Sequence, residues 1–188
     1  MNSAHVEFLS SPAWTAWLER ELLPWISSVG DLGGDVIEVG PGPGLTTDLL
    51  RSRARRVTAV EIDDALAAAL AERMGGTNME VIHADGTKSG LPSDRYSSAA
   101  CFSMLHHIPS PATQDELFRE MHRLLAPGGR LFACDSQDLD VIRVFHEGDT
   151  FVPIAPETIE TRLTKAGFTD IALSTTDFEV RFSARKPL

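Results

Sequence analysis

Short apolar runs alternate with amphipathic stretches along most of this chain. Runs rich in β-branched and small apolar residues predict buried strands at Asp35–Gly40, Arg56–Asp63, Met79–Asp85, Tyr96–Ser103 and Arg130–Asp135. Helical spacing between these runs predicts helices at Leu45–Arg53, Asp63–Met74 and Pro111–Leu125. Such alternation requires parallel strands with right-handed crossovers. We therefore expect an α/β fold, Rossmann-like and doubly wound, with a mostly parallel sheet.

The two ends of the chain have different patterns. Residues 1–30 predict a helical cap, with a helix at Ser11–Ser28 that Ser11 caps and that Pro24 ends or kinks. After a predicted helix at Pro156–Ala166, the tail predicts two strands around a polar turn, which is an antiparallel hairpin. The segment 137–155 is long for a connection and carries a short predicted helix, so we expect it to act as a lid.

Composition narrows the function classes. The 188 residues fit one domain, 1–188, and the formal net charge of −10 disfavours binding to nucleic acid or to an anionic membrane surface. Neither a membrane-spanning apolar run nor a secretory leader is evident, so the expected location is cytoplasmic. Cys101 and Cys134 lie within apolar runs and are expected to be buried thiols. The sequence predicts no particular oligomeric state.

Candidate chemistry gathers at the carboxyl ends of the first three predicted strands, where parallel sheets bind ligands. The first strand is followed by the glycine-rich loop Gly40–Gly44, which permits close approach of a ligand to the backbone. The second ends at Glu61, whose carboxylate can accept hydrogen bonds from a ribose, and the third ends at Asp85-Gly86, where a carboxylate can accept from an exocyclic amine. Together they predict a pocket for an adenosine with a positively charged tail.

The loop distinguishes among adenosine cofactors. A dinucleotide motif requires G-x-G-x-x-G, but here the third glycine comes one residue early, at Gly44. Pro41 and Pro43 also lack the amide hydrogens that a pyrophosphate would use. No phosphate-binding G-x-x-x-x-G-K-[ST] loop is present. Glu38 would repel a pyrophosphate and suits an ammonium group.

The ordered motifs resemble those of class I S-adenosylmethionine-dependent methyltransferases. VIEVGPGPG, VTAVEID, HADGTKSGLP, FSMLHHIPSP and REMHRLLAPGGRLFACD resemble five successive segments of that family, across about residues 35–185. The resemblance implies a seven-stranded sheet with an antiparallel last strand and S-adenosylmethionine as cofactor. It implies the following cofactor-binding residues: Glu38 near the ammonium; Gly40, Pro41, Gly42 and Gly44 along the methionine; Glu61 at the ribose and Ile62 on the adenine; Asp85 and Gly86 at the adenine amine; Ser103, Met104 and Leu105 under the sulfonium.

The implied reaction is an in-line displacement at the sulfonium methyl. His106 is the candidate general base, because it follows the fourth strand at the active edge; the alternative is that it only packs against the domain. Ser103 stands where metal-dependent relatives carry an acid, although Asp135 fits a second such position, so no metal is expected. A small-molecule acceptor is the leading hypothesis. The alternatives are a non-catalytic or partner-activated cofactor-binding protein and a protein methyltransferase.

Overall fold

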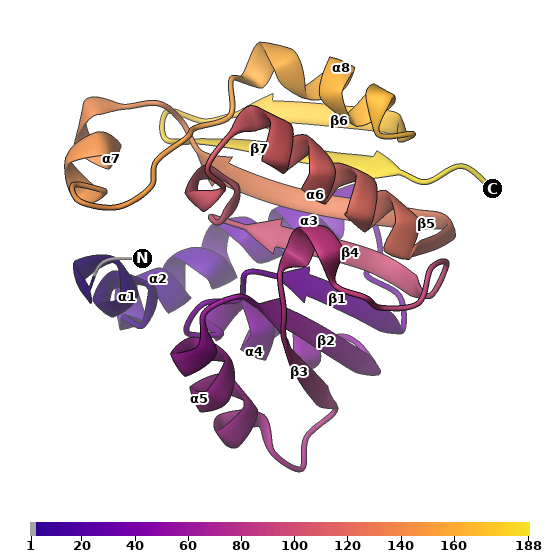
Figure 1. The fold of residues 1–188 in the computed structure, drawn as a ribbon, viewed down its shortest axis with the longest axis horizontal. Helices are drawn as coiled ribbons and strands as arrows, with labels where there is room; N and C mark the ends of the chain where they lie inside the picture. Colours follow the sequence, from indigo (N-terminus) through magenta and orange to yellow (C-terminus); the bar gives the residue numbers. More distant parts are fainter. Residues whose placement is uncertain (1–2) are drawn as a thin grey trace.

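The computed structural model describes residues 3–188 and contains a seven-stranded sheet in the order β3-β2-β1-β4-β5-β7-β6 (Figure 1). The first five strands run parallel, and β7 is antiparallel to both β5 and β6. Their bounds are β1 Asp35–Val39, β2 Arg56–Glu61, β3 Met79–His83, β4 Tyr96–Phe102, β5 Leu125–Ser136, β6 Thr169–Thr175 and β7 Glu179–Arg185. The expected doubly wound fold and its C-terminal hairpin are confirmed.

Helices cover both faces of the sheet. The helices α6 (Pro111–Leu124) and α8 (Pro156–Lys165) pack on one face, and α3 (Leu23–Val29) and α4 (Leu45–Arg51) pack on the other. The helix α5 (Asp64–Met74) packs on β2 and β3, on the side of α4. Two short 3-10 turns, η2 (Gly86–Lys88) and η3 (Leu105–His107), follow β3 and β4.

Alternate residues of the central strands enter opposite cores. Val36 belongs to the core beside α3 and α4, whereas its neighbour Ile37 belongs to the core beside α6. This period of two is what a sheet buried on both faces requires. Cys101 and Cys134 enter opposite cores as free buried thiols, as the sequence predicts.

The N-terminal segment is helical over more of its length than the sequence predicts. Ser11 caps α2 (Pro12–Trp17) by accepting a hydrogen bond from the backbone N–H of Trp14 at 3.2 Å. Pro24 does not end the helical segment: a π-helical turn, η1 (Leu18–Leu22), precedes α3, and such turns relieve a break in the hydrogen-bond ladder. An additional helix, α1 (Ser3–Leu9), lies within the predicted helical cap but was not predicted individually.

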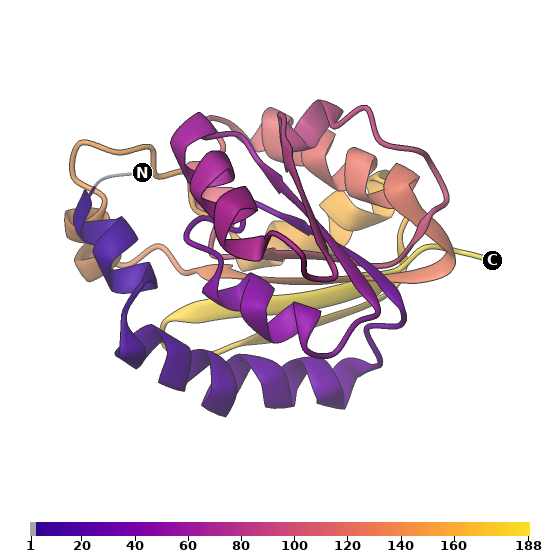
Figure 2. The same ribbon diagram turned by 90° about the horizontal axis from the view of Figure 1, so that it is seen from below.

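Two peripheral helices meet beyond the carboxyl ends of the parallel strands. Figures 1 and 2 show α1 and α7 (Asp140–Phe145) at the same end of the molecule. The rings of Phe8 and Phe145 join them edge to face, with centroids 5.8 Å apart. In the part of the chain that the structure describes, no helix has the length and apolar character needed to cross a bilayer.

Candidate active site

The glycine-rich loop joins β1 to α4 in a conformation that its glycines make possible. Gly40 and Gly44 have φ angles of 69° and 84°, in the left-handed region that other residues rarely adopt. A Cβ atom on Gly40 would lie 2.9 Å from the side chain of Met104, and one on Gly44 would meet the side chains of Leu70 and Arg73. The loop therefore packs closely against the end of β4 on one side and against α5 on the other.

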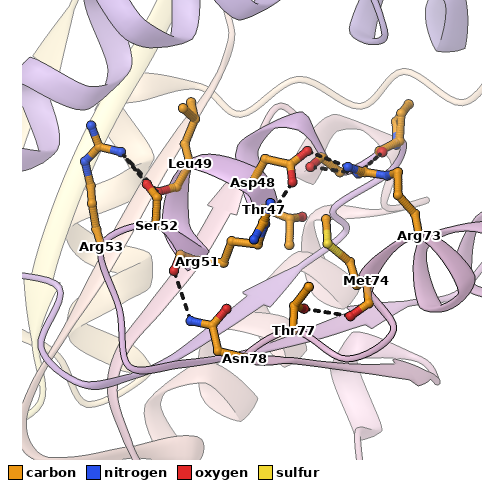
Figure 3. A network of polar contacts seen from close by, with 12 residues as sticks. Thr47, Asp48, Leu49, Arg51, Ser52, Arg53, Arg73, Met74, Thr77 and Asn78 are labelled. Atoms are coloured by element: carbon orange, nitrogen blue, oxygen red, sulfur yellow. Dashed lines mark hydrogen bonds and ion pairs between the residues drawn. The ribbon is translucent and has the colours of Figure 1, made fainter.

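A polar network between α4 and α5 stabilises this loop (Figure 3). Arg73 of α5 donates hydrogen bonds to the backbone carbonyls of Pro43, at 2.9 Å, and Gly44, at 3.2 Å. The same guanidinium pairs with Asp48 of α4, which also pairs with Arg51 at 3.0 Å. Asn78 donates to the carbonyls of Arg51 and Ala54, both at 3.0 Å. Arg73 therefore joins the start of α4 to α5, and Asn78 joins the end of α4 to the start of β3.

Glu61, the last residue of β2, accepts hydrogen bonds from the backbone of two separate loops. One carboxylate oxygen accepts a hydrogen bond from the N–H of Gly42 and the other accepts one from the N–H of Asp63, each at 3.0 Å. The side chain is buried, and each oxygen keeps lone-pair capacity for a further donor. Glu61 is thus positioned to accept two hydroxyl groups from a bound ligand.

Glu38 is buried beneath the loop. Its carboxyl group accepts a hydrogen bond of 2.6 Å from the hydroxyl of Thr47 on α4, and burial raises its pKa to about 7. It lines none of the cavities described below. The structure therefore does not bring this predicted ammonium partner to a ligand-facing wall.

A cavity of about 400 Å³ opens over the glycine loop. We call it the loop cavity; it is bounded by residues 40–43, 61–63 and 102–104 together with His107. Leu9 and Trp14 line it from the N-terminal segment, and Asp149 and Thr150 line it from the segment 137–155. Both predicted covering segments thus contribute to its wall.

A second cavity, of about 270 Å³, adjoins the first. We call it the Asp85 cavity; it shares Gly40, Ile62, Met104 and His107 with the loop cavity and adds Asp85 and Gly86. One oxygen of Asp85 accepts hydrogen bonds from the N–H and the hydroxyl of Thr87, both at 2.8 Å. Among the described residues the other oxygen has no hydrogen-bond partner, so it can accept one from a ligand.

The electrostatics of the loop cavity favour a cation. Glu61, Asp63 and Asp149 line it, and none of its described lining residues is a lysine or arginine. Burial, together with the neighbouring His106, lowers the pKa of His107 to about 4, so this ring is neutral at pH 7. A positively charged ligand group therefore meets only acidic or neutral side chains here.

Several predicted residues lie outside these two cavities. Gly44, Leu105 and His106 line neither of them. The ring of His106 is buried and pairs through Nδ1 with Asp135 at 2.5 Å; its role as a general base stays a prediction. The predicted residues that line at least one cavity are Gly40, Pro41, Gly42, Glu61, Ile62, Asp85, Gly86, Ser103 and Met104.

A third cavity, of about 630 Å³, meets the loop cavity at Trp14 and Ser103. We call it the tryptophan cavity, because the stacked rings of Trp14 and Trp17, with centroids 4.6 Å apart, line it together with Phe8 and Phe178. Ser103 stands between the two cavities with a φ of 52°. Such a backbone angle in a residue other than glycine often marks a functional position.

Sequence reasoning missed the residues that complete these walls from distant segments. None of Trp14, Trp17, Asp149 and Thr150 was predicted to line the site. The length of the segment 137–155 was the one feature of the sequence that pointed to Asp149 and Thr150. His106 was the predicted base, and nothing in the sequence indicated that its neighbour His107 would line the cavities instead.

Comparison with known proteins agrees with this geometry. A family model described as a methyltransferase domain matches residues 37–133, which is more than half of the chain. Ubiquinone biosynthesis O-methyltransferase of Pseudomonas fluorescens is 30% identical over 113 residues, covering 57% of this chain and 47% of that protein. An rRNA adenine N-6-methyltransferase of Saccharopolyspora erythraea is 39% identical over 82 residues, covering 42% of this chain and 22% of that protein. The chain therefore spans about half the length of the first relative and a smaller share of the second.

Solved structures show the same fold. The N-methyltransferase NodS of Bradyrhizobium japonicum, in complex with S-adenosyl-L-homocysteine, superposes with a TM-score of 0.74 at 18% identity, covering 96% of this chain and 91% of that one. The motif order, the sheet order, the cavity over the glycine loop and the matching family model lead to one conclusion. The chain belongs to the class I S-adenosylmethionine-dependent methyltransferase family.

Proposed function

We propose that this protein transfers the methyl group of S-adenosylmethionine to a small molecule that carries a flat apolar group. The observation that carries the proposal is the junction of the loop cavity with the tryptophan cavity at Ser103 and Trp14. One side of the junction suits the cofactor and the other suits an acceptor. The two are contiguous where methyl transfer requires them to be.

The described residues fit the cofactor at three points. Glu61 would accept hydrogen bonds from the ribose, and Asp85 from the adenine amine. Gly40 leaves room that a Cβ atom would fill, next to Met104. The absence of lysine and arginine from the described wall suits an ammonium and a sulfonium group. When bound, the cofactor supplies an electrophilic methyl group on sulfur.

The chain contributes mainly positioning and exclusion of water. Leu9, Trp14 and Thr150 cover the loop cavity from two segments, and the Ser103 backbone marks where donor and acceptor would meet. Orienting two reactants in this way contributes up to roughly 7–11 kcal/mol to lowering a barrier. A protein that only binds the cofactor has no need of a cover over the methyl group. The covered cavity therefore supports catalysis over the non-catalytic alternative.

The tryptophan cavity supports an uncharged aromatic acceptor. Its apolar wall consists of Trp14, Trp17, Phe8 and Phe178. Its charges are already paired, since Arg181 contacts both Glu179 and Glu21. The sequence relatives include an O-methyltransferase and an N-6-methyltransferase, which supports an oxygen or a nitrogen as the acceptor atom. The net charge of −10 disfavours a nucleic-acid acceptor.

The test is transfer of radiolabelled methyl from S-adenosylmethionine to a panel of small phenols and aromatic amines, with structured RNA and denatured protein as competing acceptors. We expect labelling within the small-molecule panel. Trp17→Ala should raise the acceptor KM while leaving cofactor affinity unchanged, whereas Trp25→Ala, which removes a ring packed on Phe132, should leave the acceptor KM unchanged. Labelling of RNA or protein alone would contradict the proposal, and cofactor binding with no labelled product would favour the non-catalytic alternative.

A further inference from the structure

Three histidines from two distant segments converge at the end of the sheet. His106 and His107 form the η3 turn after β4, and His146 follows α7. One ring nitrogen from each lies within 4.8 Å of those of the other two, and His106 and His146 are buried. The rings of His106 and His107 have centroids 4.2 Å apart, and those of His106 and His146 are 4.7 Å apart.

Hydrogen bonds define which nitrogens carry protons. Asp135 accepts the backbone N–H groups of Leu105, at 2.8 Å, and Ser136, at 2.7 Å. Nδ1 of His106, 2.5 Å from this carboxylate, is therefore the protonated nitrogen. Nδ1 of His146 lies 2.7 Å from the carbonyl oxygen of Ile142, which can only accept, so it also carries a proton.

The Nε2 atoms of the same two rings face each other. Nε2 of His106 and Nε2 of His146 are 3.0 Å apart. A contact between two ring nitrogens at that distance requires either a proton or a metal ion between them.

The surroundings favour the metal ion. Three imidazoles, rather than two, converge on the same point. Metal-binding histidines almost always donate their other N–H to a carboxylate or a carbonyl, and here Asp135 and Ile142 supply one of each. A second carboxylate, Asp149, places Oδ2 3.8 Å from Nδ1 of His107 and adds negative charge. Ligand nitrogens around tetrahedral zinc lie about 3.3 Å apart, from Zn–N bonds of about 2.0–2.1 Å, so a small opening of the pair admits the ion.

We propose that His106, His107 and His146 bind one divalent transition-metal ion, with zinc the best match, and that the ion fastens the segment 137–155 to the end of β4. Imidazole nitrogen is a preferred ligand of zinc, and neutral rings need no deprotonation to bind it. Because His107 also lines the loop and Asp85 cavities, the ion would stabilise the wall of the cofactor pocket. This proposal is independent of methyl transfer and departs from the sequence-based expectation of no metal.

The test uses the full chain without a histidine tag, stripped with a chelator and titrated with Zn²⁺ against a chromophoric competitor. We expect one zinc ion per chain in the unmodified protein and in His83→Gln, which removes an exposed histidine outside the cluster. His146→Gln and His107→Gln should each lose stoichiometric binding, and Asp135→Asn should weaken it by about 10–100-fold. Added Zn²⁺ should raise the Tm of the unmodified protein and of His83→Gln, but not of His146→Gln.

Cobalt provides a second measurement. Co²⁺ bound by the three imidazoles should produce visible absorption bands that His146→Gln lacks, with circular dichroism confirming that each variant is folded. If His146→Gln does not fold, His107→Gln takes its place in this comparison. Zinc stoichiometry in the unmodified protein no higher than in His146→Gln would overturn the proposal and would assign a shared proton to the histidine pair.

Discussion

The carboxylates of two neighbouring strands, Glu61 and Glu38, have different partners. Glu61 binds two backbone N–H groups and still has capacity for a ligand. Glu38, in the adjacent strand, is enclosed and bonded to Thr47. Residue type and position in a motif predicted that both would face the cofactor. Both are buried, but in the folded protein only Glu61 lines a cavity. Each role leads to a separate prediction.

Glu61→Gln should weaken binding of S-adenosylhomocysteine by about 10–100-fold. The new amide group would face a backbone N–H, donor against donor, and it cannot accept a hydrogen bond from a ribose hydroxyl. Hydrogen bonds to charged groups contribute about 1.5–3 kcal/mol. Calorimetric titration measures the effect. Glu80→Gln, on the exposed face of β3, is the matched control and should bind as the unmodified protein does. Equal affinities for Glu61→Gln and this control would refute the placement of the ribose.

Glu38 should make the unliganded protein less stable as pH rises. Its pKa is 4.5 unfolded and about 7 folded, so the stabilising protonated form is lost between these values as pH increases. Relative to Glu38→Gln, the free energy of unfolding should fall by about 3 kcal/mol from pH 4.5 to above pH 7. Urea unfolding of both proteins at pH 5 and pH 8 measures it. A difference that does not change with pH would contradict the burial argument.

Much of the candidate site could be predicted at this scale because its residues directly follow strands. The parallel arrangement alone brings Gly40, Glu61 and Asp85 to one edge of the sheet. Trp14 and Asp149 could not be predicted in the same way. Their proximity depends on how the N-terminal helices and the segment 137–155 fold over that edge, and no local spacing encodes it.

At the scale of elements, pairs of helices position the loops that they flank. The helices α4 and α5 are joined behind the glycine loop by Asp48 and Arg73, and α1 meets α7 above it through Phe8 and Phe145. The first pair controls the shape of the loop cavity from below. The second pair controls its cover.

Arg73→Met should weaken S-adenosylhomocysteine binding by about three- to tenfold, because the carbonyls of Pro43 and Gly44 lose their donor. Arg51→Met removes a neighbouring guanidinium that pairs with the same Asp48 but does not reach the loop. Since both ion pairs are partly exposed, each substitution should cost less than about 1 kcal/mol of stability. Calorimetry and urea unfolding separate the two effects, and equal losses of affinity in both variants would argue against a role for Arg73 in shaping the loop.

Phe8→Ala should loosen α7. An edge-to-face aromatic pair contributes about 0.5–1.5 kcal/mol, so amide hydrogen exchange in residues 140–146 should accelerate roughly two- to tenfold. Val144→Ala truncates an exposed side chain on the same helix and should leave exchange unchanged. Identical exchange in Phe8→Ala and the unmodified protein would show that α1 does not hold the cover.

Most of the elements could be predicted, and the differences have local causes. The strand β5 begins at Leu125, earlier than predicted, because Leu125 already pairs with Tyr96 across an irregularity in the ladder. Pro24 was expected to end or kink its helix, but the helical segment continues through a π turn. The helix α1 carries no strong cap or periodic signal in its seven residues, so the sequence offered little from which to predict it.

At the scale of the whole molecule, every functional feature lies at one edge of the sheet. The loop, Asp85 and tryptophan cavities share walls there, and the histidine cluster contributes His107 to two of them. The central claim of this account is that the loop and Asp85 cavities together hold S-adenosylmethionine.

Isothermal titration of the protein with S-adenosylmethionine, and separately with S-adenosylhomocysteine, tests that claim most directly. The account predicts saturable binding of each at one site per chain, weakened by Glu61→Gln and unchanged by Glu80→Gln. Absence of binding by both compounds, in protein whose circular dichroism shows it to be folded, would contradict the account.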